Sequence, residues 1–177
     1  MLIILELFVM LVLANGTPVV AAGLLKNRWS APVDGGRLLS DGRPVFGESK
    51  TWRGVVSGAL ACGLFALFTG LGFVFGLLFG LLGLGGDLLS SFMKRRMGLA
   101  SSARAVGLDQ IPEALLPMLL AMWWLPVSLW VVLVVVVVFT LSNIYGSTVS
   151  VYAGSPTKPG RESGCEGLLP AGSSGER

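Results

Sequence analysis

Three long apolar stretches separated by polar segments dominate the hydrophobic pattern of the chain. They cover residues 2–25, 54–92 and 111–145. A helix needs about 20 apolar residues to cross the hydrocarbon core of a bilayer. The first stretch therefore predicts one membrane-spanning helix, and each of the other two is long enough for two.

Turn-forming residues divide the two longer stretches. Residues 69–72 (TGLG) break the second stretch, and Pro126 breaks the third. The pattern predicts an all-α integral membrane protein with five transmembrane helices and two charged cytosolic loops. The expected helices are 2–25, 53–69, 72–93, 110–125 and 127–146. Residues 1–146 form the predicted membrane-embedded domain, and the Pro/Gly/Ser-rich residues 147–177 form a tail that we expect to be disordered.

The composition agrees with a membrane location. Only 13% of the 177 residues are charged and 53% are hydrophobic, whereas a soluble domain carries about 25% charged residues. The absence of histidine excludes imidazole as a base or metal ligand. The two cysteines provide neither a disulfide framework nor a cysteine-rich metal site. The N-terminal stretch lacks a basic region, so we interpret it as a retained helix rather than a cleaved signal peptide.

Positive charge gathers on one predicted side of the membrane. All 13 Lys and Arg residues lie in residues 26–53, in residues 94–109 or in the tail. With five spans these segments share a face, and the positive-inside rule makes that face cytoplasmic. The net charge of +3 follows from this orientation, and no base-stacking motif accompanies it, so we expect no nucleic-acid partner.

Glycines recur through the second and third predicted helices. They lie mostly three to five residues apart and are Gly54, Gly58 and Gly63, then Gly72, Gly76, Gly80 and Gly83. Helices in lipid associate through small residues, so this pattern indicates close helix packing rather than chemistry.

The end of the third predicted helix, GGDLLSSFMKRRMG, carries a polar stripe. Asp87, Ser90, Ser91, Lys94 and Arg95 share one face at 3.6 residues per turn. A salt-bridge ladder within the helix and a basic membrane anchor would explain the stripe. A carboxylate at the membrane is costly, however, and usually marks a functional site.

Other polar residues lie in segments that could face this stripe. The loop before the second helix is rich in glycine around Lys50 and Thr51, which suits approach to a phosphate, although the P-loop order is absent. A solvated loop explains these residues equally well. Asn15 lies inside the first span, where a buried amide needs a partner. Asp109 stands at the mouth of the fourth helix, one turn before Glu113.

These groups together favour a particular chemistry. Two separated carboxylates, Asp87 and Asp109, without His or Cys ligands suit Mg²⁺. The surrounding Lys and Arg residues would neutralise a polyphosphate. A site at the inner membrane surface indicates a substrate that is half lipid, so the residues favour phosphoryl or nucleotidyl transfer to an amphiphile.

Three segments resemble the signature of one family. The stretch GDLLSSFMKRRMGLASSARAVGLDQIPE resembles that of the CDP-archaeol synthases, in the CDP-diglyceride cytidylyltransferase superfamily. The segments LANGTPV and DGGRLLSDGRPVFGESKTWRG resemble two further family motifs, and all three occur in family order within residues 1–146.

The resemblance implies a Mg²⁺-dependent enzyme. It would transfer a cytidylyl group from CTP to an isoprenoid glycerol phosphate ether lipid, giving unsaturated CDP-archaeol and pyrophosphate. The implied location is the cell membrane, multi-pass, with the active site on the cytoplasmic face. The oligomeric state stays open, with a homodimer as one option.

The resemblance also implies residue roles. Asp87 and Asp109 would hold Mg²⁺ and Lys94 would be the third catalytic residue. The implied substrate-binding residues are polar or cationic, namely Asn15, Lys50, Thr51, Arg53, Ser90, Ser91, Arg95 and Arg96. The chain departs from the family pattern at Phe139, where the family has a histidine four residues before Asn143, and in its long polar tail.

Alternative functions are a CDP-diacylglycerol-type synthase, another CDP-lipid phosphotransferase and a small membrane transporter. The CDP-alcohol phosphotransferase motif begins at Asp41 and Gly42, but its Ala-Arg and its paired downstream aspartates are missing. A transporter would explain an amide inside the first span. It would not explain why the charges gather in two cytosolic loops.

Overall fold

The computed structural model describes residues 2–26, 28–47, 49–98 and 110–153, and these fold into five helices. The helices are α1 (Leu2–Leu25), α2 (Trp52–Phe68), α3 (Phe73–Arg96), α4 (Gln110–Trp124) and α5 (Leu129–Ala153). The only strand-like pairings in these ranges are isolated bridges in the loop between α1 and α2. The predicted all-helical fold is confirmed, and residues 154–177 of the predicted tail lie outside the described part.

Two predicted breaks occur where the turn-forming residues stand. Between α2 and α3 the backbone turns at Gly70 and Gly72, whose φ angles are +82° and +96°, values that only glycine adopts readily. Between α4 and α5 the helix is interrupted around Pro126, which has no amide hydrogen to continue it.

Two helices extend beyond their predicted ends. α3 continues through the cationic residues 94–96 instead of ending at residue 93, because positive side chains are favourable at the negative end of the helix dipole. α5 begins at Leu129 rather than at residue 127, after the proline break, and continues to Ala153 rather than to residue 146. The sequence contains no proline between Pro126 and Pro156 that would stop it earlier.

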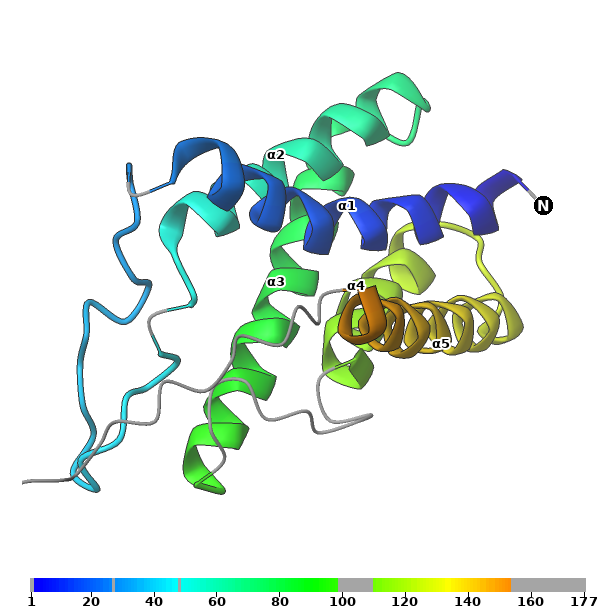
Figure 1. Cartoon of the computed structure of the whole chain (residues 1–177). Helices are drawn as coiled ribbons and strands as arrows, with labels where there is room; N and C mark the ends of the chain where they lie inside the picture. Colours follow the sequence, from blue (N-terminus) through cyan, green and yellow to red (C-terminus); the bar gives the residue numbers. More distant parts are fainter. Residues whose placement is uncertain (1, 27, 48, 99–109, 154–177) are drawn as a thin grey trace, which may run out of the picture.

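α3 is the central helix of the bundle. It packs against α2, α4 and α1, while α5 packs against α4 and α1 (Figure 1). A Cβ atom on Gly76 would lie 2.3 Å from the carbonyl oxygen of Cys62, and one on Gly86 would lie 2.3 Å from that of Pro112. The backbones therefore touch at these positions, which confirms the predicted close packing there. The prediction was wrong for Gly72, where a Cβ would meet nothing within 4 Å and the positive φ serves the α2–α3 turn.

The outward faces of the helices are apolar. Phe68 is 87% exposed and Leu24 is 79% exposed, whereas Met10 and Phe79 are fully buried in the core. Within the described residues, α1 and α3 are long and apolar enough to cross a membrane, and α2 and the 129–145 part of α5 are shorter apolar helices. Such an apolar surface suits contact with lipid, where helices satisfy their own backbone hydrogen bonds.

Tryptophans lie near two opposite ends of the bundle. Trp29 and Trp52 adjoin the α1–α2 loop, and Trp123, Trp124 and Trp130 adjoin the α4–α5 turn. The loop and the turn lie on opposite sides of the bundle in Figure 1. Tryptophan favours the headgroup region of a bilayer.

The tight α2–α3 contact provides a stability prediction. Gly76→Ala places a methyl group against the backbone of α2, and we expect a loss of about 1–3 kcal/mol in unfolding free energy. Gly85→Ala on the same helix is the matched control, since its Cβ would meet nothing within 4 Å, and it should be neutral or stabilising by up to about 1 kcal/mol. Thermal unfolding in detergent compares the two, and equal melting temperatures would contradict the packing role.

Candidate functional site

The α1–α2 loop (residues 26–51) is folded around one carboxylate. Asp34 accepts hydrogen bonds from the amides of Gly36 at 3.0 Å, Phe46 at 3.0 Å and Gly47 at 3.1 Å. Burial by itself would raise the pKa of Asp34, but these hydrogen bonds outweigh it and lower the pKa below its ordinary value. The ionised carboxylate thus holds the two arms of the loop together.

The base of this loop carries a lysine that reaches α3. Lys50 Nζ lies 2.7 Å and 2.5 Å from the two carboxylate oxygens of Asp87. The two side chains are only 23% and 29% exposed. Ionised hydrogen bonds of this kind are roughly twice as strong as neutral ones. The pair joins segments 37 residues apart in sequence and neutralises the carboxylate next to the apolar bundle.

A larger cavity of about 550 Å³ opens on one side of this ion pair. Its wall from α1 includes Asn15, Pro18 and Val19, and its wall from α3 includes Leu84 and Leu88. Thr51 and Arg53, at the start of α2, also line it. The cavity therefore combines an apolar side made by membrane helices with a polar side made by the loop.

A smaller cavity of about 250 Å³ also borders the pair. Ser91, Lys94 and Arg95 line it from α3, and Gln110 and Asn143 line it from α4 and α5. The two cavities share four residues, which are Ser49, Lys50, Asp87 and Glu113. The Lys50–Asp87 pair therefore stands where an amphiphilic cavity meets a cationic one.

Most of the predicted site residues come together around these cavities. Asn15, Thr51 and Arg53 line the larger one, Ser91, Lys94 and Arg95 line the smaller one, and Lys50 and Asp87 line both. The polar stripe on α3 thus turns one face toward the loop and toward α4.

Four predicted residues have other positions or further contacts. The Ser90 hydroxyl is buried and donates to the Asp87 carbonyl at 2.9 Å. The Arg53 guanidinium donates to the carbonyls of Lys26 and Arg28, which ties the start of α2 to the end of α1. Arg96 pairs with the loop rather than facing the ion pair. Asp109 lies outside the described residues.

The sequence did not assign Ser49, Glu113, Gln110 or Asn143 to the site, yet all four line a cavity. The signal for Glu113 was its position one helical turn after Asp109. Gln110 follows Asp109 and Ser49 precedes Lys50, both of which the sequence assigned to the site. Only the packing of the helices shows that Gln110 and Ser49 also face the cavities.

α5 contributes the side-chain amide of Asn143 to the site. Phe139, the position that departs from the family pattern, lies in the core instead. Asn143 lines the smaller cavity and donates through Nδ2 to the carbonyl of Phe139 at 3.1 Å. Phe139 is 1% exposed and belongs to the apolar core. An aromatic ring at this position therefore fills space between helices.

The donor set around the pair fits a hard divalent cation. Asp87 and Glu113 border both cavities, and carboxylate oxygens are the ligands that Mg²⁺ prefers. Within the described ranges, no group of three or more acidic, His or Cys side chains gathers as a ready cation cage. A Mg²⁺ site usually takes only one or two carboxylates from the protein, and water and substrate phosphates supply the other ligands.

Comparison with known proteins identifies the class. The family model described as CarS-like, CDP-archaeol synthase, matches residues 1–153. The chain therefore belongs to the CarS-like CDP-archaeol synthase family. It is also similar to a solved structure described as an intramembrane enzyme for archaeal membrane lipid biosynthesis, with a TM-score of 0.66 and 30% identity over 81% of this chain and 91% of the other. The fold is thus that of an all-helical membrane protein.

Particular relatives carry the same family name. The CDP-archaeol synthase of Thermococcus onnurineus is 38% identical over 109 residues, which cover 55% of this chain and 61% of the relative. That of Pyrococcus furiosus is 40% identical over 109 residues, covering 55% and 60%. The chain spans about three fifths of the length of these curated relatives.

The Asp34 hydrogen bonds predict a loop that depends on one ionised carboxylate. Asp34→Asn replaces an acceptor oxygen with an NH₂ donor. We expect the free energy of opening of the Phe46 and Gly47 amide hydrogen bonds to fall by about 1–2 kcal/mol. Hydrogen exchange followed by mass spectrometry measures this change.

The pH dependence has a defined sign. Because the folded pKa of Asp34 is lowered, its contribution is present above the ordinary pKa and is lost as the pH falls through the folded value. Exchange rates corrected for intrinsic chemistry should rise in the wild type between about pH 6 and about pH 3, and much less in Asp34→Asn. Equal pH responses in the two proteins would contradict this role.

Proposed function

We propose that this chain transfers a cytidylyl group from CTP to an isoprenoid ether lipid phosphate, forming a CDP-activated lipid and pyrophosphate. Family membership supports the reaction class. The observation that carries the proposal is the Lys50–Asp87 pair at the junction of two cavities, one partly apolar and one cationic. Such a junction is what a reaction between a lipid and a nucleotide requires.

The cavities suggest where each substrate binds. Lys94 and Arg95 line the smaller cavity beside Lys50, and this cluster of cations suits the triphosphate of CTP. Pro18, Val19 and Leu88 give the larger cavity an apolar wall on membrane helices. We assign the larger cavity to the glycerol phosphate end of the lipid, with its chains continuing toward the bilayer.

The chemistry then needs positioning and charge stabilisation rather than an enzyme nucleophile. An oxygen of the lipid phosphate forms a bond to the α-phosphorus of CTP, and the bond from that phosphorus to the bridging oxygen of pyrophosphate breaks. Lys94 and Arg95 would stabilise the negative charge that collects on the leaving pyrophosphate. Lys50 would orient the groups that meet at the junction.

Mg²⁺ is the proposed cofactor. Asp87 and Glu113 would hold it among the described residues, and Asp109 is a further proposed ligand from the sequence. When bound, the ion would neutralise phosphate charge and polarise the P–O bond under attack.

We further propose that all five helices cross the membrane and that the site faces the cytoplasm. Every Lys and Arg lies within residues 26–53, within residues 94–109 or in the tail, and this supports the orientation. The tryptophans near the two ends of the bundle agree with it.

An activity assay tests the function directly. Purified protein in detergent receives labelled CTP and Mg²⁺ with a geranylgeranyl-ether glycerol phosphate or a diacyl phosphatidate. We expect CDP-lipid from the ether lipid and a loss of at least about 100-fold in Asp87→Asn, because a proposed Mg²⁺ ligand and the partner of Lys50 are lost. Glu6→Gln is the control, since this carboxylate lies near the opposite end of α1 from the cavity wall, and it should keep wild-type turnover.

The other outcomes separate the alternatives. Product from the diacyl lipid alone would indicate a CDP-diacylglycerol-type synthase. No product in protein that melts cooperatively would overturn the proposed reaction and favour a transporter.

The assignment of cavities predicts a split in Michaelis constants. Lys94→Gln should raise KM for CTP about tenfold or more, since a charged contact to phosphate is worth about 1.5–3 kcal/mol, and should leave KM for the lipid nearly unchanged. Val19→Trp narrows the larger cavity and should raise KM for the lipid alone. Steady-state kinetics with each substrate varied in turn decides the point, and the reverse pattern would exchange the two assignments.

A further inference from the structure

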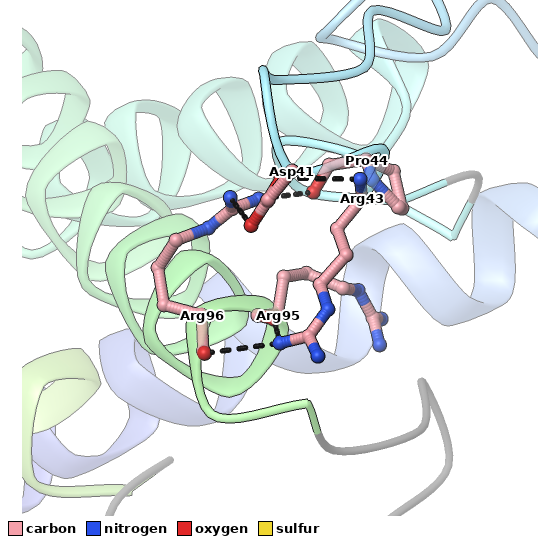
Figure 2. Close-up of polar contacts among 5 residues, drawn as sticks. All are labelled: Asp41, Arg43, Pro44, Arg95 and Arg96. Carbon is pink, nitrogen blue, oxygen red and sulfur yellow. Dashed lines mark hydrogen bonds and ion pairs between the residues drawn. The ribbon is translucent and has the colours of Figure 1, made fainter.

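A cluster of ionic and carbonyl contacts joins the tip of the α1–α2 loop to the end of α3 (Figure 2). Arg43 Nη1 donates to the carbonyl oxygens of Arg95 at 3.2 Å and Arg96 at 3.1 Å. The Arg96 guanidinium pairs with the Asp41 carboxylate and donates to the Pro44 carbonyl at 3.0 Å. Each segment thus sends one arginine to the other, and we call this set of contacts the clamp.

The clamp satisfies groups that the end of a helix otherwise leaves open. The last carbonyls of an α-helix have no partner within it. Arg43 supplies a donor for the Arg96 carbonyl and a second donor for the Arg95 carbonyl, which also accepts from the Gly98 amide at 3.2 Å. Asp41 also accepts a hydrogen bond from the Arg43 amide at 3.1 Å, which fixes the turn from which the Arg43 side chain leaves. The contacts are therefore specific in geometry and go beyond attraction between exposed charges.

Packing next to the clamp continues toward the ion pair. The Phe46 and Phe92 rings meet edge to face at 6.5 Å, and the Arg96 guanidinium lies 5.3 Å from the centre of the Phe92 ring. Gly47 follows with φ +96°, and a Cβ there would lie 3.2 Å from Nη2 of Arg95. The loop lies directly on α3 at this point, just before it reaches Lys50.

The loop and α3 are consequently joined at two points. One is the clamp at Arg96, and the other is the Lys50–Asp87 pair about 14 Å away along α3, at about 1.5 Å of rise per residue. A long lysine side chain has many rotamers and loses up to about 2 kcal/mol of conformational entropy when it is fixed. Holding the loop at its tip reduces the freedom of the backbone that carries Lys50.

We propose that Asp41, Arg43 and Arg96 are positioning residues that hold the α1–α2 loop on α3 and thereby set Lys50 against Asp87 at the junction of the cavities. This inference rests on the proposed function. It assigns Arg96 a role different from the phosphate contact that the sequence resemblance implied, because its guanidinium is engaged by Asp41 and Pro44. Substrate groups meet Lys50, and the clamp acts through it.

Kinetics in two backgrounds tests this route of action. In the wild-type background, Asp41→Asn and Arg96→Gln should each lower kcat about 5–50-fold with less than about a threefold change in KM for CTP, because positioning of Lys50 is lost and no substrate contact is. In the Lys50→Gln background the same substitutions should change kcat less than about twofold, since the group on which they act is gone. Arg96→Lys keeps the charge but loses the planar guanidinium, so its kcat should lie between those of the wild type and Arg96→Gln.

A matched control and a structural readout complete the experiment. Arg37→Gln removes an exposed cation of the same loop and should leave kcat unchanged. Hydrogen exchange should show faster opening of residues 45–51 in Asp41→Asn and Arg96→Gln, but not in Arg37→Gln.

Each outcome decides between distinct conclusions. A higher KM for CTP in Arg96→Gln, with Asp41→Asn unchanged and the effect intact in the Lys50→Gln background, would overturn the proposal and make Arg96 a direct substrate contact. Unchanged exchange in both clamp variants would also overturn it. If the clamp variants exchange faster but the wild type turns over no substrate, the clamp is confirmed as a contact that holds the loop, and the proposed function is rejected.

Discussion

The Lys50–Asp87 ion pair is the contact on which the arrangement of this molecule depends. A carboxylate next to an apolar helix bundle is costly unless a positive group offsets its lost hydration. Lys50 supplies that group from a segment 37 residues away in sequence. The pair therefore fixes the loop relative to α3, and it does so at the point where the two cavities meet. Removal of either partner alone would leave the other charge beside apolar surface.

Close helix packing brings the remaining groups to this pair. Gly86 allows α4 to touch α3 at Pro112, and the next residue along α4 is Glu113, which borders both cavities. Between α1 and α2, Gly58 lies against the backbone of Ala14, beside the Asn15 that lines the larger cavity. The residues that pack the bundle are thus neighbours in sequence of the residues that line the site, so packing and chemistry constrain each other.

The sequence predicted local features well and contacts between distant segments poorly. Helix positions followed from apolar length and turn-forming residues, which act within a few positions of themselves. The polar face of α3 followed from helical periodicity. The pairing of Lys50 with Asp87 did not follow, because many cations could have reached that carboxylate and only the fold selects one. The same reason explains why the contact of Arg96 with Asp41 was not predicted, and why the cavity positions of Glu113 and Asn143 were missed.

The positive charge on the predicted cytoplasmic face serves two different purposes. Lys50, Lys94 and Arg95 line the smaller cavity, whereas Arg43 and Arg96 hold the loop on the end of α3 through carbonyl and carboxylate groups. Arg43 and Arg96 each commit guanidinium nitrogens to holding the loop, which leaves fewer of their N–H groups for any other partner. In the proposed function, the phosphates of CTP would therefore meet Lys50, Lys94 and Arg95 first, while Arg43 and Arg96 would hold the loop that carries Lys50.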